Sequence, residues 1–182
     1  MPVLVDPEGP GGKEISIFES GAILIYLADK VCRFLPKHGN ARYNVLQWLM
    51  FQMGNLGPIC GQAHHFREAS PERVPYGINR FTNEAERLYK VMDQRLKETS
   101  YLAGEEFSIA DIASWPWARV HRYHGQHWEN FPNVKRWFDV VTARPAVQKG
   151  MTLLLNKRAK TRDVLNEEAR DILFGQTQMA KR

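Results

Sequence analysis

The stretch that decides the fold opens the chain: MPVLVD (1–6), a turn segment rich in proline and glycine (7–12), and ISIFESGAI (15–23). Residues 3–5 and 15–18 are short apolar, largely β-branched runs, and the residues between them favour a turn, so the pattern predicts a β-hairpin. A helix is expected to follow at once. Ser20 suits its N-cap position, and one apolar face is marked by Ile23, Leu24, Leu27 and Val31.

The junction between the second strand and this helix suits a ligand with charges of both signs. A helix N-terminus presents free N–H groups to a carboxylate, and the Ser20 hydroxyl adds a donor. Glu19 could hold an ammonium group, as in a free amino-acid end. Pro2, if its peptide bond is cis, would turn backbone groups toward a second piece of peptide. A peptide with a free amino-acid end describes glutathione, although a plain capped hairpin explains the same spacing.

The composition is that of an ordinary globular protein. The chain has 182 residues, of which 43% are hydrophobic and 25% charged, with a net charge of +5. Lysines and arginines are interleaved with acidic residues, which argues against nucleic-acid binding and is compatible with an anionic peptide ligand. Cys32 and Cys60 fit no metal or redox motif. The sparse cysteines, with no signal peptide or membrane-length apolar run, predict a cytoplasmic protein.

The remainder of the chain is expected to be helical. A linker at 36–40 separates the hairpin unit from a helix at 42–53, which Gly54, Gly57 and Pro58 should interrupt or bend. The next helix, 75–97, carries a buried stripe with spacings of three and four residues, formed by Ile78, Phe81, Ala85, Leu88, Met92 and Leu96.

Two groups of polar residues contain side chains that are common in catalytic or metal sites, but their spacing does not favour either role. Ser108 and Asp111 have the S-x-x-D spacing of a capping box, which gives Asp111 a structural role. The adjacent His64 and His65 point about 100° apart on a helix and cannot chelate one ion together. His121, His124 and His127 are expected at the surface or an interface, with metal binding as a minor alternative.

These segments resemble the cytosolic glutathione transferases over residues 1–155. MPVLVD…ISIFESGAILIYLADK is similar to the second half of their thioredoxin-like domain, in which the proline is cis and a Glu-Ser pair holds the γ-glutamyl end of glutathione. LQWLMFQMGNLGP (46–58) and GQAHHF (61–66) resemble the bacterial nu class. That class is related to the fungal nitrogen-regulation prion protein and is associated with glutathione-dependent disulfide reduction.

The resemblance assigns roles residue by residue. It implies that Glu19, Ser20, Pro2 and the backbone of Met1 bind glutathione. It also implies that Arg80, in PYGINRF (75–81), reaches the sulfur region or a carboxylate. The family's domain begins with a βαβα unit that carries the residues activating the sulfur, and no residue of this chain matches them. The chain is therefore expected to be either a piece of a longer enzyme or a protein with another role.

Together these observations predict an α+β, mainly α protein. Residues 1–36 form a partial thioredoxin-like domain, 42–155 an all-α helical domain, and 156–182 a charged tail. The expected function is glutathione-dependent thiol transfer or disulfide reduction, with glutathione as co-substrate, a small electrophile or disulfide as partner, and a homodimeric assembly. The alternative is a non-catalytic interaction module or inactive fragment. Neither nucleic acid nor a membrane is an expected partner.

Overall fold

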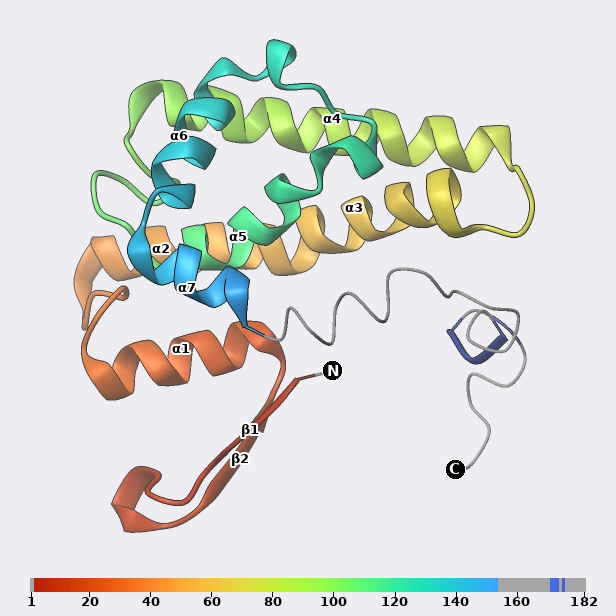
Figure 1. Ribbon diagram of the computed structural model, residues 1–182. Coiled ribbons are helices and arrows are strands. Elements are labelled where there is room, and N and C mark those ends of the chain that lie inside the picture. The colour runs from red at the N-terminus through yellow and green to blue at the C-terminus, as the bar shows by residue number, and fades with distance from the viewer. Residues whose placement is uncertain (1, 154–170, 174, 176–182) are drawn as a thin grey trace. The chain divides into compact units, whose positions relative to one another are not determined.

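The computed structural model describes residues 2–153, 171–173 and 175 (Figure 1). The chain divides into two compact units, residues 1–141 and 142–182. The described part combines one small antiparallel sheet with helices, so the expected α+β, mainly helical class is confirmed. The domain boundary expected at 36–40 stays a prediction.

The hairpin predicted from the opening stretch is present. Strands β1 (Val3–Asp6) and β2 (Ile15–Phe18) pair antiparallel, with Val3 opposite Phe18 and Asp6 opposite Ile15. A short 3₁₀ turn at Pro10–Gly12 joins the strands. Side chains alternate between the two faces of the pair, so Leu4 and Ile17 are half-buried while Val3 and Phe18 are exposed.

Helix α1 (Ser20–Val31) starts one residue earlier than predicted. Glu19, not Ser20, occupies the N-cap position, and Ser20 is the first helical residue. The reason is the backbone at Glu19, whose positive φ turns the chain from strand into helix without a capping side chain. The expected apolar face is only partly covered: Ile23 and Leu24 are half-buried, whereas Leu27 and Val31 are exposed.

The α-helix expected to be interrupted or bent by Gly54, Gly57 and Pro58 is interrupted there by a π-helical turn, and the helical path continues beyond it. Helix α2 (Gly39–Phe51) passes through a π-helical turn (Gln52–Leu56) into α3 (Gly57–His64), and a second π turn (His65–Ala69) follows. The wider π turn joins the two helices, and Pro58 sits in the first turn of α3, where its missing N–H costs little.

The helical part of the first unit is built on the predicted stripe of α4 (Pro75–Glu98), which packs along α3 (Figure 1). Ala85, Leu88, Met92 and Leu96 of that stripe are fully buried. The remaining elements are α5 (Ile109–Arg119), 3₁₀ turns at His121–His124 and Trp128–Asn130, and α6 (Pro132–Thr142).

The capping box at the start of α5 is confirmed, and it has a wider role than predicted. Asp111 accepts the Ser108 N–H at 2.9 Å, the Leu102 N–H at 3.0 Å and the Trp137 indole N–H at 2.9 Å. Asp111 and Trp137 are fully buried. One carboxylate therefore ties together the start of α5, the loop before it and α6.

The second unit contains helix α7, which spans Pro145–Thr152. Most of the segment 156–182, including Val164, Leu165 and Ala169, lies outside the described residues. Among the described residues, no helix is long and apolar enough to cross a membrane.

Candidate functional site

The junction of β2 and α1 is held in an unfavourable backbone conformation. Glu19 has φ 68° and ψ 120°, a region that non-glycine residues rarely occupy. Such a conformation costs free energy of the order of 1–3 kcal/mol, and residues of this kind are concentrated at ligand-binding sites. The Glu19 side chain is exposed. The strain therefore marks this junction as a candidate binding position.

The head of α1 can bind an anion. Ile23 is the first residue whose N–H bonds within the helix, to the Glu19 carbonyl at 2.9 Å, so the N–H groups before it have no acceptor inside the helix. The Ser20 hydroxyl lies 3.9 Å from the thioether sulfur of Met53, which is a weak acceptor. A carboxylate arriving here would find backbone N–H groups and a hydroxyl in one place.

A pocket of about 390 Å³ extends from Ser20. Its walls come from α1, the π turn after α2, and α5, elements that lie together in the first unit (Figure 1). The lining residues are Pro2, Ser20, Ile23, Leu24, Gln52, Met53, Ile112, Ala113, Pro116 and Trp117. A mainly apolar concavity with a few polar groups is the usual form of a small-molecule site.

Two of the predicted binding residues meet at this pocket, and a third is the neighbour of one of them in the chain. Pro2 and Ser20 both line the pocket, and Glu19 precedes Ser20 directly. Met1 and its bond to Pro2 lie outside the described residues, so the expected cis geometry is not described. The hairpin thus brings the start of the chain to the head of α1.

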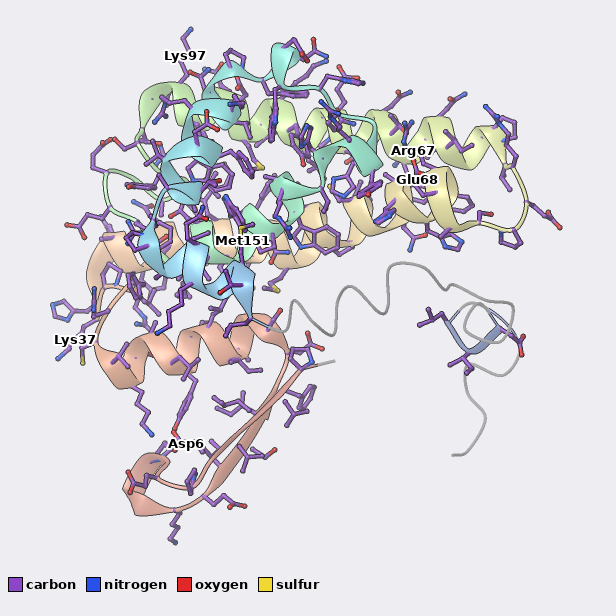
Figure 2. The ribbon with its side chains drawn as sticks, in the orientation of Figure 1. Asp6, Lys37, Arg67, Glu68, Lys97 and Met151 are labelled. Carbon is purple, nitrogen blue, oxygen red and sulfur yellow. The ribbon has the colours of Figure 1, made fainter. Side chains whose placement is uncertain are left out.

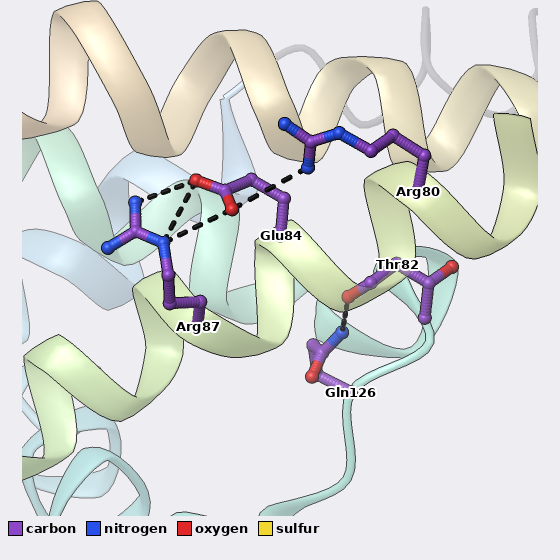
Figure 3. Close-up of polar contacts among 5 residues, drawn as sticks. All are labelled: Arg80, Thr82, Glu84, Arg87 and Gln126. Carbon is purple, nitrogen blue, oxygen red and sulfur yellow. Dashed lines mark hydrogen bonds and ion pairs between the residues drawn. The ribbon is translucent and has the colours of Figure 1, made fainter.

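Arg80 is not among the residues that line the pocket. It lies on α4 with its side chain 52% exposed, and its guanidinium is 3.6 Å from the Glu84 carboxylate (Figure 3). Arg87 binds the same carboxylate at 2.6 Å. The pKa of Glu84 is lowered, mainly by its hydrogen bond to Arg87 and also by Arg80. Within the described part of one chain, Arg80 therefore belongs to a surface charge cluster on α4.

The histidine prediction was wrong for two of the three residues near position 124. His121 and His124 are buried, because the short 3₁₀ turn that carries them folds inward, whereas His127 is exposed. The Tyr89 hydroxyl lies 3.4 Å from His124 Nδ1. Across the part of the chain that the structure describes, no three His, Cys, Asp or Glu side chains gather in a way that could hold a metal ion.

A larger depression of about 650 Å³ lies between residues 32–36, the start of α2 and the loop 103–108. Several of its polar groups already have partners: the Phe34 carbonyl accepts the Ile109 N–H, and Glu105 accepts the Ser100 hydroxyl. The strained Glu19 and the open helix terminus are at the other pocket. We therefore take the smaller pocket as the candidate site.

No local sequence pattern identifies the side chains that shape the pocket. Gln52, Met53 and Trp117 come from two elements that are distant along the chain from Ser20. The one available signal was Gln52 itself, a glutamine inside a strongly apolar helical run. Nothing in the local pattern indicates that this run packs against the head of α1.

Comparison with known proteins places the chain among characterised relatives. The family model "Glutathione S-transferase, C-terminal domain" matches residues 81–145. The disulfide-bond oxidoreductase YfcG of Escherichia coli is 43% identical over 152 residues, which is 83% of this chain and 71% of that protein.

Solved structures agree with the sequence comparison. A glutathione transferase from Burkholderia graminis, crystallised with two glutathione molecules per subunit, is 41% identical with a TM-score of 0.79. A glutathione transferase from Pseudomonas putida, with one glutathione disulfide per subunit, is 42% identical with the same TM-score. The matches cover 83% and 84% of this chain, and 66% and 69% of those chains. The chain thus spans about two thirds of their length.

Proposed function

The chain belongs to the glutathione transferase superfamily, in a nu-class-like group, and from this premise we propose that it binds glutathione at the head of α1 and uses the glutathione thiol in transfer or disulfide reduction. The observation that carries the proposal is the strained Glu19 directly before Ser20, a residue that lines an apolar pocket. We further propose a cytoplasmic location and a small electrophile or disulfide as the partner substrate.

Each predicted binding residue has a role that fits its position. The N-terminus of α1 and the Ser20 hydroxyl hold the γ-glutamyl carboxylate, and Glu19 pairs with the ammonium group. The backbone of Met1, next to Pro2, pairs with the cysteinyl residue of glutathione. The glutathione thiolate then attacks a disulfide sulfur, forming a mixed disulfide and releasing one substrate thiolate. The thiolate of a second glutathione attacks the glutathione sulfur of the mixed disulfide, which yields oxidised glutathione and releases the second substrate thiolate.

Arg80 acts, in this proposal, from a second copy of the chain in a homodimer. Its guanidinium offers fixed donors and a permanent charge to a thiolate or a glutathione carboxylate. The apolar side chains Tyr43, Met50 and Tyr76, on α2 and α4, are 69%, 50% and 79% exposed in the single chain, and burial between two copies would favour association. Sedimentation equilibrium that shows only monomer would contradict this arrangement.

A second candidate function is binding without catalysis, as in an interaction module. It is favoured by one observation: among the described residues, none that lines the pocket carries a charge. Steady-state assays of disulfide reduction separate the two candidates, because a binding module would take up glutathione without turnover.

The proposal is tested by calorimetric titration of the chain with reduced and oxidised glutathione. We expect saturable binding that is weakened about tenfold or more in Glu19→Gln and in Ser20→Ala, because each loses a charge-assisted hydrogen bond. Glu14→Gln and Ser16→Ala are matched controls, since both are exposed positions on the same hairpin. No heat at millimolar glutathione, with the chain folded, would overturn the proposal.

One further variant tests whether the strained residue Glu19 contributes to binding glutathione. Glu19→Gly removes the steric cost of the positive φ, because glycine adopts it readily, and it also removes the carboxylate. We expect this variant to unfold at a higher temperature than the wild type and to bind glutathione more weakly. Equal or tighter binding would mean that the Glu19 carboxylate has no part in the site.

A further inference from the structure

Gln52 presents a buried hydrogen-bond acceptor that has no partner. The residue is 4% exposed, and its side-chain oxygen Oε1 forms no hydrogen bond in the structure. Burying an acceptor without a partner costs free energy, because the group loses the hydrogen bonds it makes with water in the unfolded chain. Gln52 also lines the pocket, so a donor on a molecule bound there could complete the hydrogen bonding of this amide.

The local backbone holds the Gln52 amide in place. Gln52 opens the π turn between α2 and α3, and its carbonyl accepts the N–H of Gly57. A Cβ atom at Gly57 would lie 2.8 Å from the Gln52 side-chain nitrogen and 3.4 Å from the Trp117 ring. The side chain is thus packed between the start of α3 and an aromatic residue of α5, and only a residue as small as glycine leaves it this room.

The pocket beside Gln52 is otherwise apolar. Ile23, Leu24, Met53 and Trp117 supply most of its wall, and the side chains there with a strong hydrogen-bond acceptor are Ser20 and Gln52, since the Trp117 indole only donates. Ser20 belongs to the proposed glutathione site at the head of α1. With Ser20 used by glutathione, Gln52 remains in the described lining as a polar contact for the apolar group of a second substrate.

We propose that Gln52 is a specificity-determining residue, and that its Oε1 accepts a hydrogen bond from a hydroxyl or amide N–H donor carried on the apolar group of the second substrate. The inference rests on the proposed function, because Ser20 lines the same pocket. It narrows the substrate class to molecules that combine an apolar body with one donor. A site that contains a buried acceptor discriminates against an analogue without the donor, since that analogue leaves the acceptor unpaired.

The inference is tested with matched pairs of S-substituted glutathiones. One pair is S-benzylglutathione and S-(4-hydroxybenzyl)glutathione; the other is S-hexylglutathione and S-(6-hydroxyhexyl)glutathione. Each pair differs by one hydroxyl donor, and the two pairs place it at different distances from the sulfur. We expect the hydroxylated member of at least one pair to bind the wild-type chain about tenfold more tightly.

Variants at Gln52 identify the acceptor. Gln52→Met keeps the length of the side chain without the amide, and Gln52→Leu is a second apolar replacement should the first not fold. We expect either variant to abolish the preference for the hydroxylated ligand while retaining affinity for its partner. Thermal unfolding without ligand should be unchanged or shifted upward, because the unpaired acceptor is gone. Gln47→Met is the matched control, an exposed glutamine on the preceding helix.

The possible results separate a failure of the Gln52 inference from a failure of the proposed function. If the wild-type chain binds all four ligands without preference, or if the preference survives in the Gln52 variants, the inference is overturned and the proposed function stands. If none of the four ligands binds while glutathione does, the inference is overturned and the proposed function stands; if glutathione does not bind the folded chain either, the proposed function is overturned and the inference falls with it.

Discussion

His124 is a buried histidine whose ring the fold keeps neutral. It is fully buried, and its pKa is lowered from 6.5 to about 4, first by burial and then by the nearby His64, His121 and Arg67. The residue faces Tyr89 of α4 through Nδ1. Protonation of the ring in the folded state would place a positive charge among these groups without a counter-ion.

This depressed pKa predicts a loss of stability in mild acid. Between pH 6.5 and about 4 the unfolded chain binds a proton at His124 that the folded chain does not, so the free energy of unfolding falls as pH falls. The contribution of this residue is about 3 kcal/mol across that range. His121, whose pKa is also lowered, acts in the same direction. Urea unfolding at a series of pH values measures the slope.

The variant His124→Gln should remove most of that pH dependence, whatever its effect on absolute stability. His127→Gln is the control, because His127 lies on the same segment with an exposed side chain. If the free energy of unfolding of His124→Gln changes with pH as steeply as that of the wild type, folding does not prevent protonation of the His124 ring.

At the scale of elements, the hairpin is fastened to α1 through Asp6. The Asp6 carboxylate accepts a hydrogen bond from the Tyr26 hydroxyl at 2.6 Å and forms an ion pair with Lys30, both on α1 (Figure 2). Lys30 also donates to the Glu8 carbonyl at 3.0 Å. The pKa of Asp6 is lowered to about 2, mainly by Lys30, then by Tyr26 and the Glu8 N–H.

We predict that Asp6→Ala loosens the hairpin and leaves the helical core intact. Amide exchange in β2 should accelerate roughly twofold to tenfold, while exchange in α4 stays unchanged. Because the pKa is depressed, the wild-type contact is complete above about pH 4 and is lost as pH falls toward 2. Asp139→Ala, which breaks the exposed pair with Lys135 on α6, is the control. Unchanged β2 exchange would refute the role of Asp6.

At the scale of the whole molecule, one face of the hairpin remains open to solvent. Val3, Val5 and Phe18 are 61%, 55% and 61% exposed, and the pairing of Val3 with Phe18 places them on one face. Exposed apolar patches of this kind favour association. The paired residues Leu4 and Ile17 lie on the other face and are half-buried.

The open face predicts that Phe18→Thr improves solubility at little cost to the fold. We expect weaker binding of an apolar fluorescent dye and less aggregation, with the free energy of unfolding changed by less than about 0.5 kcal/mol. Ile17→Thr, on the inner face of the same strand, should instead lower stability by about 1–3 kcal/mol. Equal effects of the two variants would mean that the two faces of β2 are not distinct.

Local sequence signals determined the elements whose residues lie close together in the chain. The hairpin, the stripe of α4 and the Ser108–Asp111 box follow from strand alternation, helical spacing and capping chemistry, and all three were predicted. The resemblance of the motifs to glutathione transferases also identified the family. In each case the interacting residues are neighbours along the sequence, so their pattern carries the information.

Only the tertiary structure decided which distant residues meet at the pocket. Glu19 takes the N-cap position because its positive φ turns the chain there. No residue pattern predicts that φ. The glycines and Pro58 predicted an interruption or bend, but not that the π turn formed there would bring Gln52 and Met53 to Ser20. His124 is buried because its turn folds inward against α4. These outcomes depend on packing between elements that are distant along the chain, and such packing leaves no pattern in the local spacing of residues.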